Sequence, residues 1–321
     1  MEITLIPRTG LRLKTPVLAA SGTFGYGVEY ARRNDIAGIG AIVSKGTTRF
    51  PRRGNEPLRL METPAGMLNS IGLQNLGVEE VIQTLAPQWS QWGVPVFVNV
   101  SGTSIDEYVA VVSRIDGTPG IAGIELNISC PNVKDGGILF GSDPKSASLV
   151  TAAVRKTTGL PLMVKLSPNV AAIRPIASAV QSAGADAISL INTVYGMSID
   201  TSRRAPMLQP VSGGLSGPAI KPLALYMVYE VAKEVSVPIV GIGGILSPQD
   251  ALEFLMAGAS AVAMATALLV DPGACHAVTM GIETWCRKND VRSLDEVIGA
   301  ANPAFRPSKK ETGSTSAAGL G

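Results

Sequence analysis

The chain has 321 residues, of which 46% are hydrophobic, and its 27 basic and 25 acidic residues give a formal net charge of +2. This length suits one large domain, and the small net charge gives no reason to expect nucleic acid or an anionic membrane as a partner. No apolar run approaches the roughly 18 residues that span a bilayer, and residues 1–10 do not resemble a signal peptide, so we expect a cytoplasmic protein.

Eight short apolar runs, each ending in a polar residue or a glycine, recur along the chain. They are residues 16–21, 41–45, 96–99, 124–127, 162–165, 187–192, 239–244 and 261–266. Apolar runs of this length, bounded by turn signals, are typical of strands that are buried on both faces. Eight such strands alternating with helices predict a (β/α)8 TIM barrel, in which all strands end at one mouth.

Helices are predicted where apolar residues recur at helical spacing between these runs. The segments are 77–89, 104–115, 146–158 and 171–184. Pro175 is expected in the first turn of its helix or at a kink. A serine, a proline and an acidic residue within 247–250 form a helix start, which predicts a further helix over 248–257.

Three connections are too long to be simple turns: 46–76, 128–145 and 193–219. They follow the second, fourth and sixth strands, so we expect them to crowd one side of the barrel mouth. Loops of this length in compact domains are usually functional or disordered. The polar, small-residue-rich segment 306–321 is expected to be a disordered tail. The sequence therefore predicts a single domain over 1–305.

The seventh and eighth strands end in groups that suit an anion. Gly243 and Gly244 lie in the motif GIGGI, and Thr266 ends the last strand. Backbone N–H groups at such glycines, beside a helix N-terminus, bind anions, and TIM barrels frequently hold a phosphate between these two loops. The alternative is that the glycines only make a tight turn.

Lysine and asparagine end five other strands. A buried lysine is costly unless it is paired or serves chemistry, and none of the eight strand ends is a carboxylate that could pair with Lys45 or Lys165. These lysines therefore predict an anionic or electron-rich ligand, such as a reduced flavin or a substrate carboxylate. The amides of Asn99, Asn127 and Asn192 can read a heterocycle that carries C=O and N–H groups, although asparagine also forms turns.

Cys130 follows the fourth strand in the motif NISCPN, where a thiolate could act as a base or a nucleophile. The alternative is a small buried residue, and that is our interpretation of Cys275 and Cys286. Three cysteines without a paired spacing predict no metal or iron–sulfur site on this chain. The single histidine, His276, lies in a predicted late helix and is interpreted as structural, which disfavours histidine-based catalysis.

Seven motifs, in order, together resemble the class 1 dihydroorotate dehydrogenases, which are FMN enzymes of pyrimidine biosynthesis. The motifs are SGTFGYG (21–27), SKGTT (44–48), NSIGLQN (69–75), LNISCPNVKDGG (126–137), VKLSPN (164–169), SGGLSGPAIKP (212–222) and GIGGI (241–245). The resemblance covers about residues 2–305. Within this family, NSIGLQN and NVKDGG are similar to the B type, whereas the membrane-bound class has a serine at the position of Cys130.

The resemblance implies oxidation of (S)-dihydroorotate to orotate. Cys130 would remove a proton from C5 while a hydride passes from C6 to the flavin. Substrate contacts would come from strand ends and one loop: Lys45, Asn69, Ser70, Ile71, Gly72, Leu73, Asn127, Asn192 and Thr193. FMN would be surrounded by Ser21, Lys45, Gly46, Asn99, Asn127, Lys165, Ile191, Gly217, Gly243, Gly244, Ala265 and Thr266. Ala265 stands where this family would have glycine, and its methyl group would lie near the phosphate.

The resemblance to the B type also implies a partner. That type works with a second subunit that carries FAD and a 2Fe-2S cluster and passes electrons to NAD. We therefore expect a homodimer of this chain, joined by that electron-transfer subunit into a heterotetramer. An A-type enzyme that delivers electrons to fumarate would equally lack cluster ligands, so the sequence leaves the electron acceptor open.

Three other functions remain open on the sequence. A dihydropyrimidine dehydrogenase of similar fold would act on uracil or thymine. A non-redox barrel isomerase or lyase would use Lys165 on a phosphorylated substrate. A tRNA-modifying flavoprotein should carry a basic RNA-binding extension, which this sequence does not show.

Overall fold

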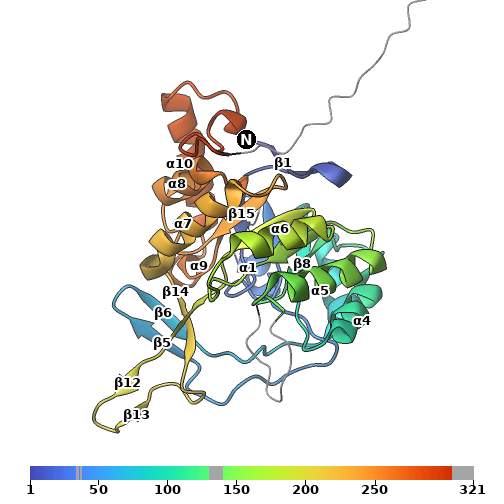
Figure 1. The fold of residues 1–321 in the computed structure, drawn as a ribbon, viewed down its shortest axis with the longest axis vertical. Coiled ribbons are helices and arrows are strands. Elements are labelled where there is room, and N and C mark those ends of the chain that lie inside the picture. Colours follow the sequence, from blue (N-terminus) through green and yellow to red (C-terminus); the bar gives the residue numbers. More distant parts are fainter. Residues whose placement is uncertain (34–35, 37, 130–139, 306–321) are drawn as a thin grey trace, which may run out of the picture.

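The computed structural model describes residues 1–33, 36, 38–129 and 140–305. In these residues, eight parallel strands close into a barrel with helices around its outside (Figure 1). The strands are β3 (Val17–Ala19), β4 (Ala41–Val43), β7 (Val96–Val100), β8 (Gly123–Asn127), β9 (Leu162–Lys165), β10 (Ala187–Leu190), β15 (Ile239–Ile242) and β16 (Ala261–Met264).

Each barrel strand pairs with its predecessor in this chain order, and β16 pairs with β3 to close the cylinder. Every residue of these eight strands is buried, which is the burial that near-continuous apolar runs predict for strands covered on both faces. The structure therefore confirms all eight predicted strands and the TIM barrel.

The predicted helices are present in the structure. They are α4 (Ile105–Ile115), α5 (Pro144–Thr157), α6 (Arg174–Ser182) and α8 (Pro248–Ala257). Pro175 lies in the first turn of α6, where its missing N–H costs no helical hydrogen bond. At the start of α8, Ser247 and Asp250 bond reciprocally to each other's backbone N–H groups, forming a capping box.

The segment predicted as a helix over 77–89 is helical but interrupted. It consists of α2 (Val78–Glu80), a π-helical stretch η2 (Val81–Leu85) and α3 (Ala86–Trp89). Pro87 lies near the junction of η2 and α3. Because proline lacks an N–H and its ring clashes with the carbonyl one turn earlier, a widened turn accommodates it.

Further helices complete the outer layer: α1 (Val28–Arg33), α7 (Lys221–Ala232), α9 (Ala267–Val270) and α10 (Ala274–Lys288), with short 3-10 turns η1 (Pro7–Thr9), η3 (Pro218–Ile220) and η4 (Leu294–Glu296). Before the barrel, β1 (Ile3–Ile6) and β2 (Leu11–Leu13) form an antiparallel hairpin. Figure 1 shows β1 in the upper part of the molecule.

Two of the long connections combine into structure that the sequence did not predict. The segments 46–76 and 193–219 contribute β5 (Leu60–Thr63), β6 (Gly66–Asn69), β11 (Val194–Gly196) and β14 (Gly213–Ser216) to one antiparallel sheet of order β11-β14-β6-β5. A small hairpin, β12 (Ile199–Asp200) with β13 (Ala205–Pro206), extends beyond it, at the bottom of Figure 1. The third long connection lies mostly outside the described residues.

Within the described part of the chain, no helix combines the length and the apolar character that crossing a bilayer requires. The predicted tail, 306–321, lies outside the described residues.

Candidate active site

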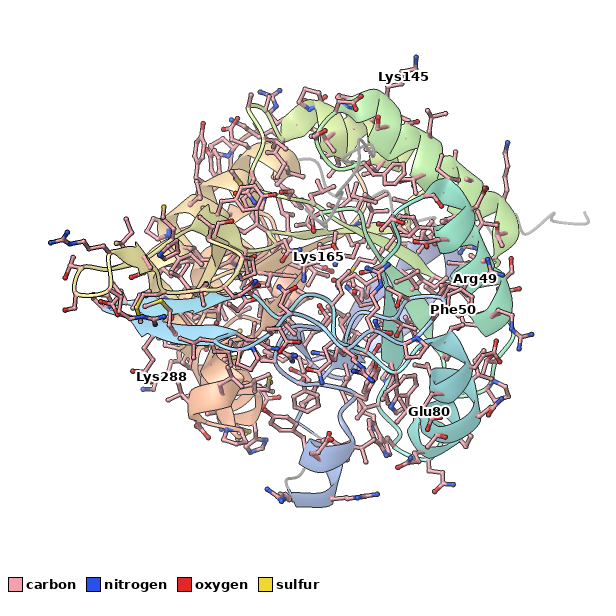
Figure 2. The ribbon with its side chains drawn as sticks, turned by 90° about the horizontal axis from the view of Figure 1, so that it is seen from below. Arg49, Phe50, Glu80, Lys145, Lys165 and Lys288 are labelled. Carbon is pink, nitrogen blue, oxygen red and sulfur yellow. The ribbon has the colours of Figure 1, made fainter. Side chains whose placement is uncertain are left out.

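A cavity of about 840 Å³ opens at the carboxyl ends of the barrel strands, beside the antiparallel sheet. This volume falls in the range of small-molecule and cofactor pockets. Among the described lining residues, the charged side chains are Lys45 and Lys165, so the cavity favours an anionic ligand. Figure 2 shows Lys165 near the middle of the molecule, whereas Lys145 and Lys288 point outward at its periphery.

All described residues that the sequence nominates line this one cavity. They are Ser21, Lys45, Gly46, Asn69, Ser70, Ile71, Gly72, Leu73, Asn99, Asn127, Lys165, Ile191, Asn192, Thr193, Gly217, Gly243, Gly244, Ala265 and Thr266. The fold brings them together because parallel strands of a closed barrel end at the same mouth. Cys130 lies outside the described residues. The ligand that each of these residues contacts stays a prediction.

Lys165 has a carboxylate neighbour that the strand ends did not reveal. Its Nζ lies 3.8 Å from Oε2 of Glu125, which is only 1% exposed. None of the strand ends is a carboxylate, as the sequence indicates, but Lys165 nevertheless has a carboxylate partner inside the barrel. Glu125 lies two residues before Asn127 in β8, and side chains two residues apart share one face of a strand. A search along the inward face of each strand, rather than at strand ends alone, would have found it.

Lys45 follows β4 and is half-buried at the cavity wall. Burial lowers the pKa of the Lys45 ammonium, and the nearby positive charge of Arg59 lowers that pKa further. Both effects disfavour the charged form, and a bound carboxylate would offset them. The ammonium form of Lys45 would therefore be stabilised by an anion bound in the cavity.

The side chains of Asn127 and Asn192 are joined by hydrogen bonds through Ser129. The Ser129 hydroxyl donates to Oδ1 of Asn127 at 2.6 Å and accepts from Nδ2 of Asn192 at 2.5 Å. Oδ1 of Asn192 also accepts from the backbone N–H of Thr193 at 2.8 Å. Sequence reasoning did not nominate Ser129, and its place in the NISC motif, directly before Cys130, was the available signal.

Asn169 is another cavity residue that the sequence analysis did not single out. Its Nδ2 donates to the carbonyl of Thr193 at 3.0 Å, and its Oδ1 accepts from the N–H of Tyr195 at 2.9 Å. Asn69 similarly donates to the carbonyl of Gly214 at 3.0 Å, which links β6 to β14. Side-chain amides therefore fasten the long connections over the mouth, with Asn169 coming from the VKLSPN motif.

The glycine turn after β15 combines a tight backbone with a place at the cavity. Gly243 and Gly244 have φ angles of +136° and +72°. A Cβ at Gly244 would lie 2.7 Å from Cβ of Lys221 and 2.9 Å from the carbonyl oxygen of Gly217. The turn therefore requires glycine, as the alternative interpretation held, and the same glycines also border the cavity. A phosphate could approach such a backbone closely.

Residues 265–266, which follow β16, form the part of the cavity wall next to the glycine turn. The Thr266 hydroxyl donates to Oγ of Ser216 at 2.9 Å, and the Thr23 hydroxyl donates to the carbonyl of Ala265 at 2.8 Å. The cavity has amides and lysines on one side, which suit a planar heterocycle. On the other side it has glycines and hydroxyl groups, which suit a phosphate. The cavity's donors thus fit a flavin mononucleotide.

The other cysteines and the histidine take no part in this cavity. Cys275 and Cys286 are buried in α10, and burial raises the pKa of the Cys275 thiol to about 12. Burial also raises the pKa of Cys286. His276 is exposed on the same helix, beside Gly38. A thiol with such a raised pKa is a poor nucleophile at neutral pH, in agreement with a structural role.

Comparison with known proteins agrees with this geometry. The family model described as dihydroorotate dehydrogenase matches residues 6–285. A protein of Desulforudis audaxviator (strain MP104C), named dihydroorotate dehydrogenase B (NAD(+)), catalytic subunit, is 51% identical over 93% of this chain and 97% of its own length. Proteins with the same name from Geobacter sp. (strain M21) and Desulforamulus reducens (strain ATCC BAA-1160 / DSM 100696 / MI-1) are 50% and 49% identical, over 91% and 94% of this chain and 95% and 100% of their own lengths. By these matches, which extend over nearly the whole barrel, the chain belongs to the dihydroorotate dehydrogenase family.

Proposed function

We propose that the chain, as one domain over 1–305, oxidises (S)-dihydroorotate to orotate in de novo pyrimidine biosynthesis, with FMN bound at the barrel mouth. The observation that carries this proposal is the convergence on one cavity of nominated residues spread from Ser21 to Thr266. The relatives' shared name, dihydroorotate dehydrogenase B, supports the same reaction.

FMN would be held by two groups of residues. Gly217, Gly243, Gly244, Ala265 and Thr266 would surround its phosphate end, where glycine backbone can approach an anion closely. The remaining FMN contacts would come from strand ends: Ser21, Lys45, Gly46, Asn99, Asn127, Lys165 and Ile191. When bound, FMN supplies the acceptor for the hydride that leaves C6 of the substrate.

The substrate would lie against the loop 69–73 and the amide network. Lys45 would pair with its carboxylate, and Asn127, Asn192 and Thr193 would hold its ring. Because Ser129 fixes the two amides in one orientation, their donors and acceptors are preorganised for the ring. Cys130 would remove the C5 proton, a role that rests on its motif.

We further propose a B-type assembly in the cytoplasm. The relatives' name contains both NAD(+) and "catalytic subunit", which supports a separate subunit for electron transfer. That subunit would carry FAD and a 2Fe-2S cluster, accept electrons from FMN and pass them to NAD. Two copies of this chain would form a homodimer core, and each would bind one such subunit, giving a heterotetramer.

The function is tested by purifying the chain and following flavin absorbance. We expect a yellow protein whose FMN spectrum changes on addition of orotate and bleaches with dihydroorotate under anaerobic conditions. A spectral response to uracil but not to orotate would instead favour a dihydropyrimidine dehydrogenase. A colourless protein that takes up no added FMN would contradict the flavin proposal and favour a non-redox barrel enzyme. Co-purification of an FAD- and iron-containing companion from native cells would test the B-type assembly.

Orotate affinity should fall at alkaline pH through Lys45. Binding of the carboxylate requires the protonated amine, so affinity is constant below the pKa of Lys45 and falls above it by up to about tenfold per pH unit. Because the pKa of Lys45 is lowered, orotate affinity should begin to fall at a pH below the pKa of an ordinary lysine, which is about 10.4. The measurement is the orotate dissociation constant between about pH 7 and pH 10, in Cys130→Ala protein so that the thiol does not titrate. Lys45→Met should bind weakly and without this pH dependence; an equal slope in that variant would contradict the assignment.

Gly244→Ala should weaken FMN binding by at least about tenfold, or about 1.4 kcal/mol. The added methyl group would displace Gly217 or Lys221, on which it impinges, and Gly217 lines the same cavity. Gly117→Ala is the matched control, since Gly117 has a φ of +73° and a Cβ added there would meet no atom within 4 Å. Both variants incur similar backbone strain. Isothermal titration of the apoprotein with FMN is the measurement, and equal affinities in the two variants would argue against a phosphate site at this turn.

A further inference from the structure

A buried carboxylate lies inside the barrel beneath the proposed FMN site, and the reaction proposed for this site does not use it. Glu125 is in the middle of β8, surrounded by three other barrel strands. Its Oε2 accepts from Nδ2 of Asn99 at 2.6 Å, and its Oε1 accepts from the hydroxyl of Ser189 at 2.8 Å. The third neighbour is Nζ of Lys165, 3.8 Å from Oε2. Burying a carboxylate is costly without such partners, so this arrangement holds β7, β9 and β10 in a defined relation to β8.

Two of these partners are cavity residues to which we assign FMN contacts. A carboxylate can only accept hydrogen bonds, so Glu125 requires Asn99 to turn its amide nitrogen inward. Oδ1 of Asn99 is then left on the side of Ser101, whose hydroxyl lies 3.5 Å away, and of Gly46. Glu125 thereby selects one of the two amide orientations and sets which atom of Asn99 faces the ligand.

Lys165 is held between Glu125 and the cavity. Its Nζ lies 3.5 Å from Oγ of Ser21, which also lines the cavity. The positive charge that a ligand meets at this wall is therefore partly balanced by a carboxylate immediately behind it. Charge interactions in a buried site are less screened than in water, so this balance bears strongly on a ligand whose charge changes.

We propose that Glu125 is a positioning residue that orients Asn99 and Lys165 and lowers the midpoint potential of the bound flavin. The inference rests on the proposed binding of FMN at this mouth. Reduced flavin carries a negative charge that Lys165 stabilises and Glu125 opposes. Removing the charge of Glu125 should leave Lys165 unbalanced and make the reduced state more favourable.

The test is the midpoint potential of FMN in purified wild type and Glu125→Gln, measured by anaerobic titration against a reference dye. Glutamine keeps the size of the side chain and an acceptor for Ser189 but removes the charge. We expect Glu125→Gln to retain FMN and to shift the reduced-to-oxidised equilibrium toward reduction by at least tenfold, which is about 30 mV for a two-electron couple. Ser189→Ala is the matched control, because it removes a hydrogen bond to the same carboxylate without changing its charge; its equilibrium should shift by less than tenfold.

The outcomes separate this inference from the proposed function. Wild-type protein that binds no FMN overturns the proposed function, and the role of Glu125 falls with it. Wild-type protein that binds FMN, with an unchanged or lower potential in Glu125→Gln, overturns the inference alone. Should Glu125→Gln not fold, Glu125→Asp moves the carboxylate away from Lys165 while keeping its charge. That variant should shift the equilibrium in the same direction by a smaller factor, and an unchanged or lower potential there would equally overturn the inference.

Discussion

Cys130→Ala should leave FMN bound and slow flavin reduction by dihydroorotate about 10²-fold or more, which is the usual range for loss of a general base. The physical reason is that hydride transfer from C6 requires removal of the C5 proton, and alanine offers no group that can take it. The measurement is anaerobic stopped-flow absorbance of the flavin after mixing with dihydroorotate. Cys286→Ala is the control, since this thiol is buried in α10 and does not line the cavity.

The pH dependence of the wild-type rate provides an independent check on Cys130. A free thiol titrates at about pH 8.5, and only the thiolate accepts the proton. Flavin reduction should therefore accelerate through mildly alkaline pH. Unimpaired reduction in Cys130→Ala would reject the role, as would a flat wild-type profile between about pH 6 and 9 once proton transfer is shown to limit the rate.

Asp186→Ala should lower the free energy of unfolding by about 3 kcal/mol, the lower end of the range for breaking a buried ion pair, since Arg8 is half-exposed. Asp186 lies just before β10, and its carboxylate joins three separate segments. It accepts from the Arg8 guanidinium in η1, from Arg155 in α5 at 3.0 Å and from the N–H of Leu162 in β9 at 2.8 Å. Its loss leaves a partly buried Arg155 charge and a buried N–H without this acceptor.

Arg12→Ala is the comparison for Asp186→Ala, measured by urea denaturation. Arg12 in β2 pairs with Glu2, close to Arg8 in the chain, but both side chains are more than half exposed. Loss of this ion pair should therefore cost less than about 1 kcal/mol. FMN affinity should be unchanged in both variants, because Asp186 precedes its barrel strand and the cavity lies at the carboxyl ends. Equal destabilisation by the two substitutions would show that the contacts of Asp186 contribute no more stability than an exposed ion pair does.

The barrel strands and most of the helices could be predicted because the sequence patterns that indicate them are local. The apolar runs that became β3 to β16 of the barrel are buried on both faces, and such strands tolerate few polar residues. Start signals also depend on neighbouring residues only, so the capping box of Ser247 and Asp250 placed the beginning of α8 correctly. The break in the 77–89 helix was missed, although Pro87 marks it.

The antiparallel sheet over the mouth could not be predicted in the same way. Its strands β5, β6, β11 and β14 are short and mostly half-exposed, so they lack a strong hydrophobic period. Their pairing joins residues far apart in the chain, such as Leu215 with Leu68. Such register depends on how the barrel places the two connections, which no local pattern contains.

By itself, the sequence determined the eight strands, most of the helices and the residues at the strand ends, because burial and capping act on neighbours along the chain. Only the tertiary structure decided how charges are matched between strands. The pairing of Lys165 with Glu125 and the orientation of Asn99 depend on the register of β7, β8 and β9 around the closed barrel. These side chains lie on different strands, and their proximity arises only when the sheet closes and turns them toward one interior.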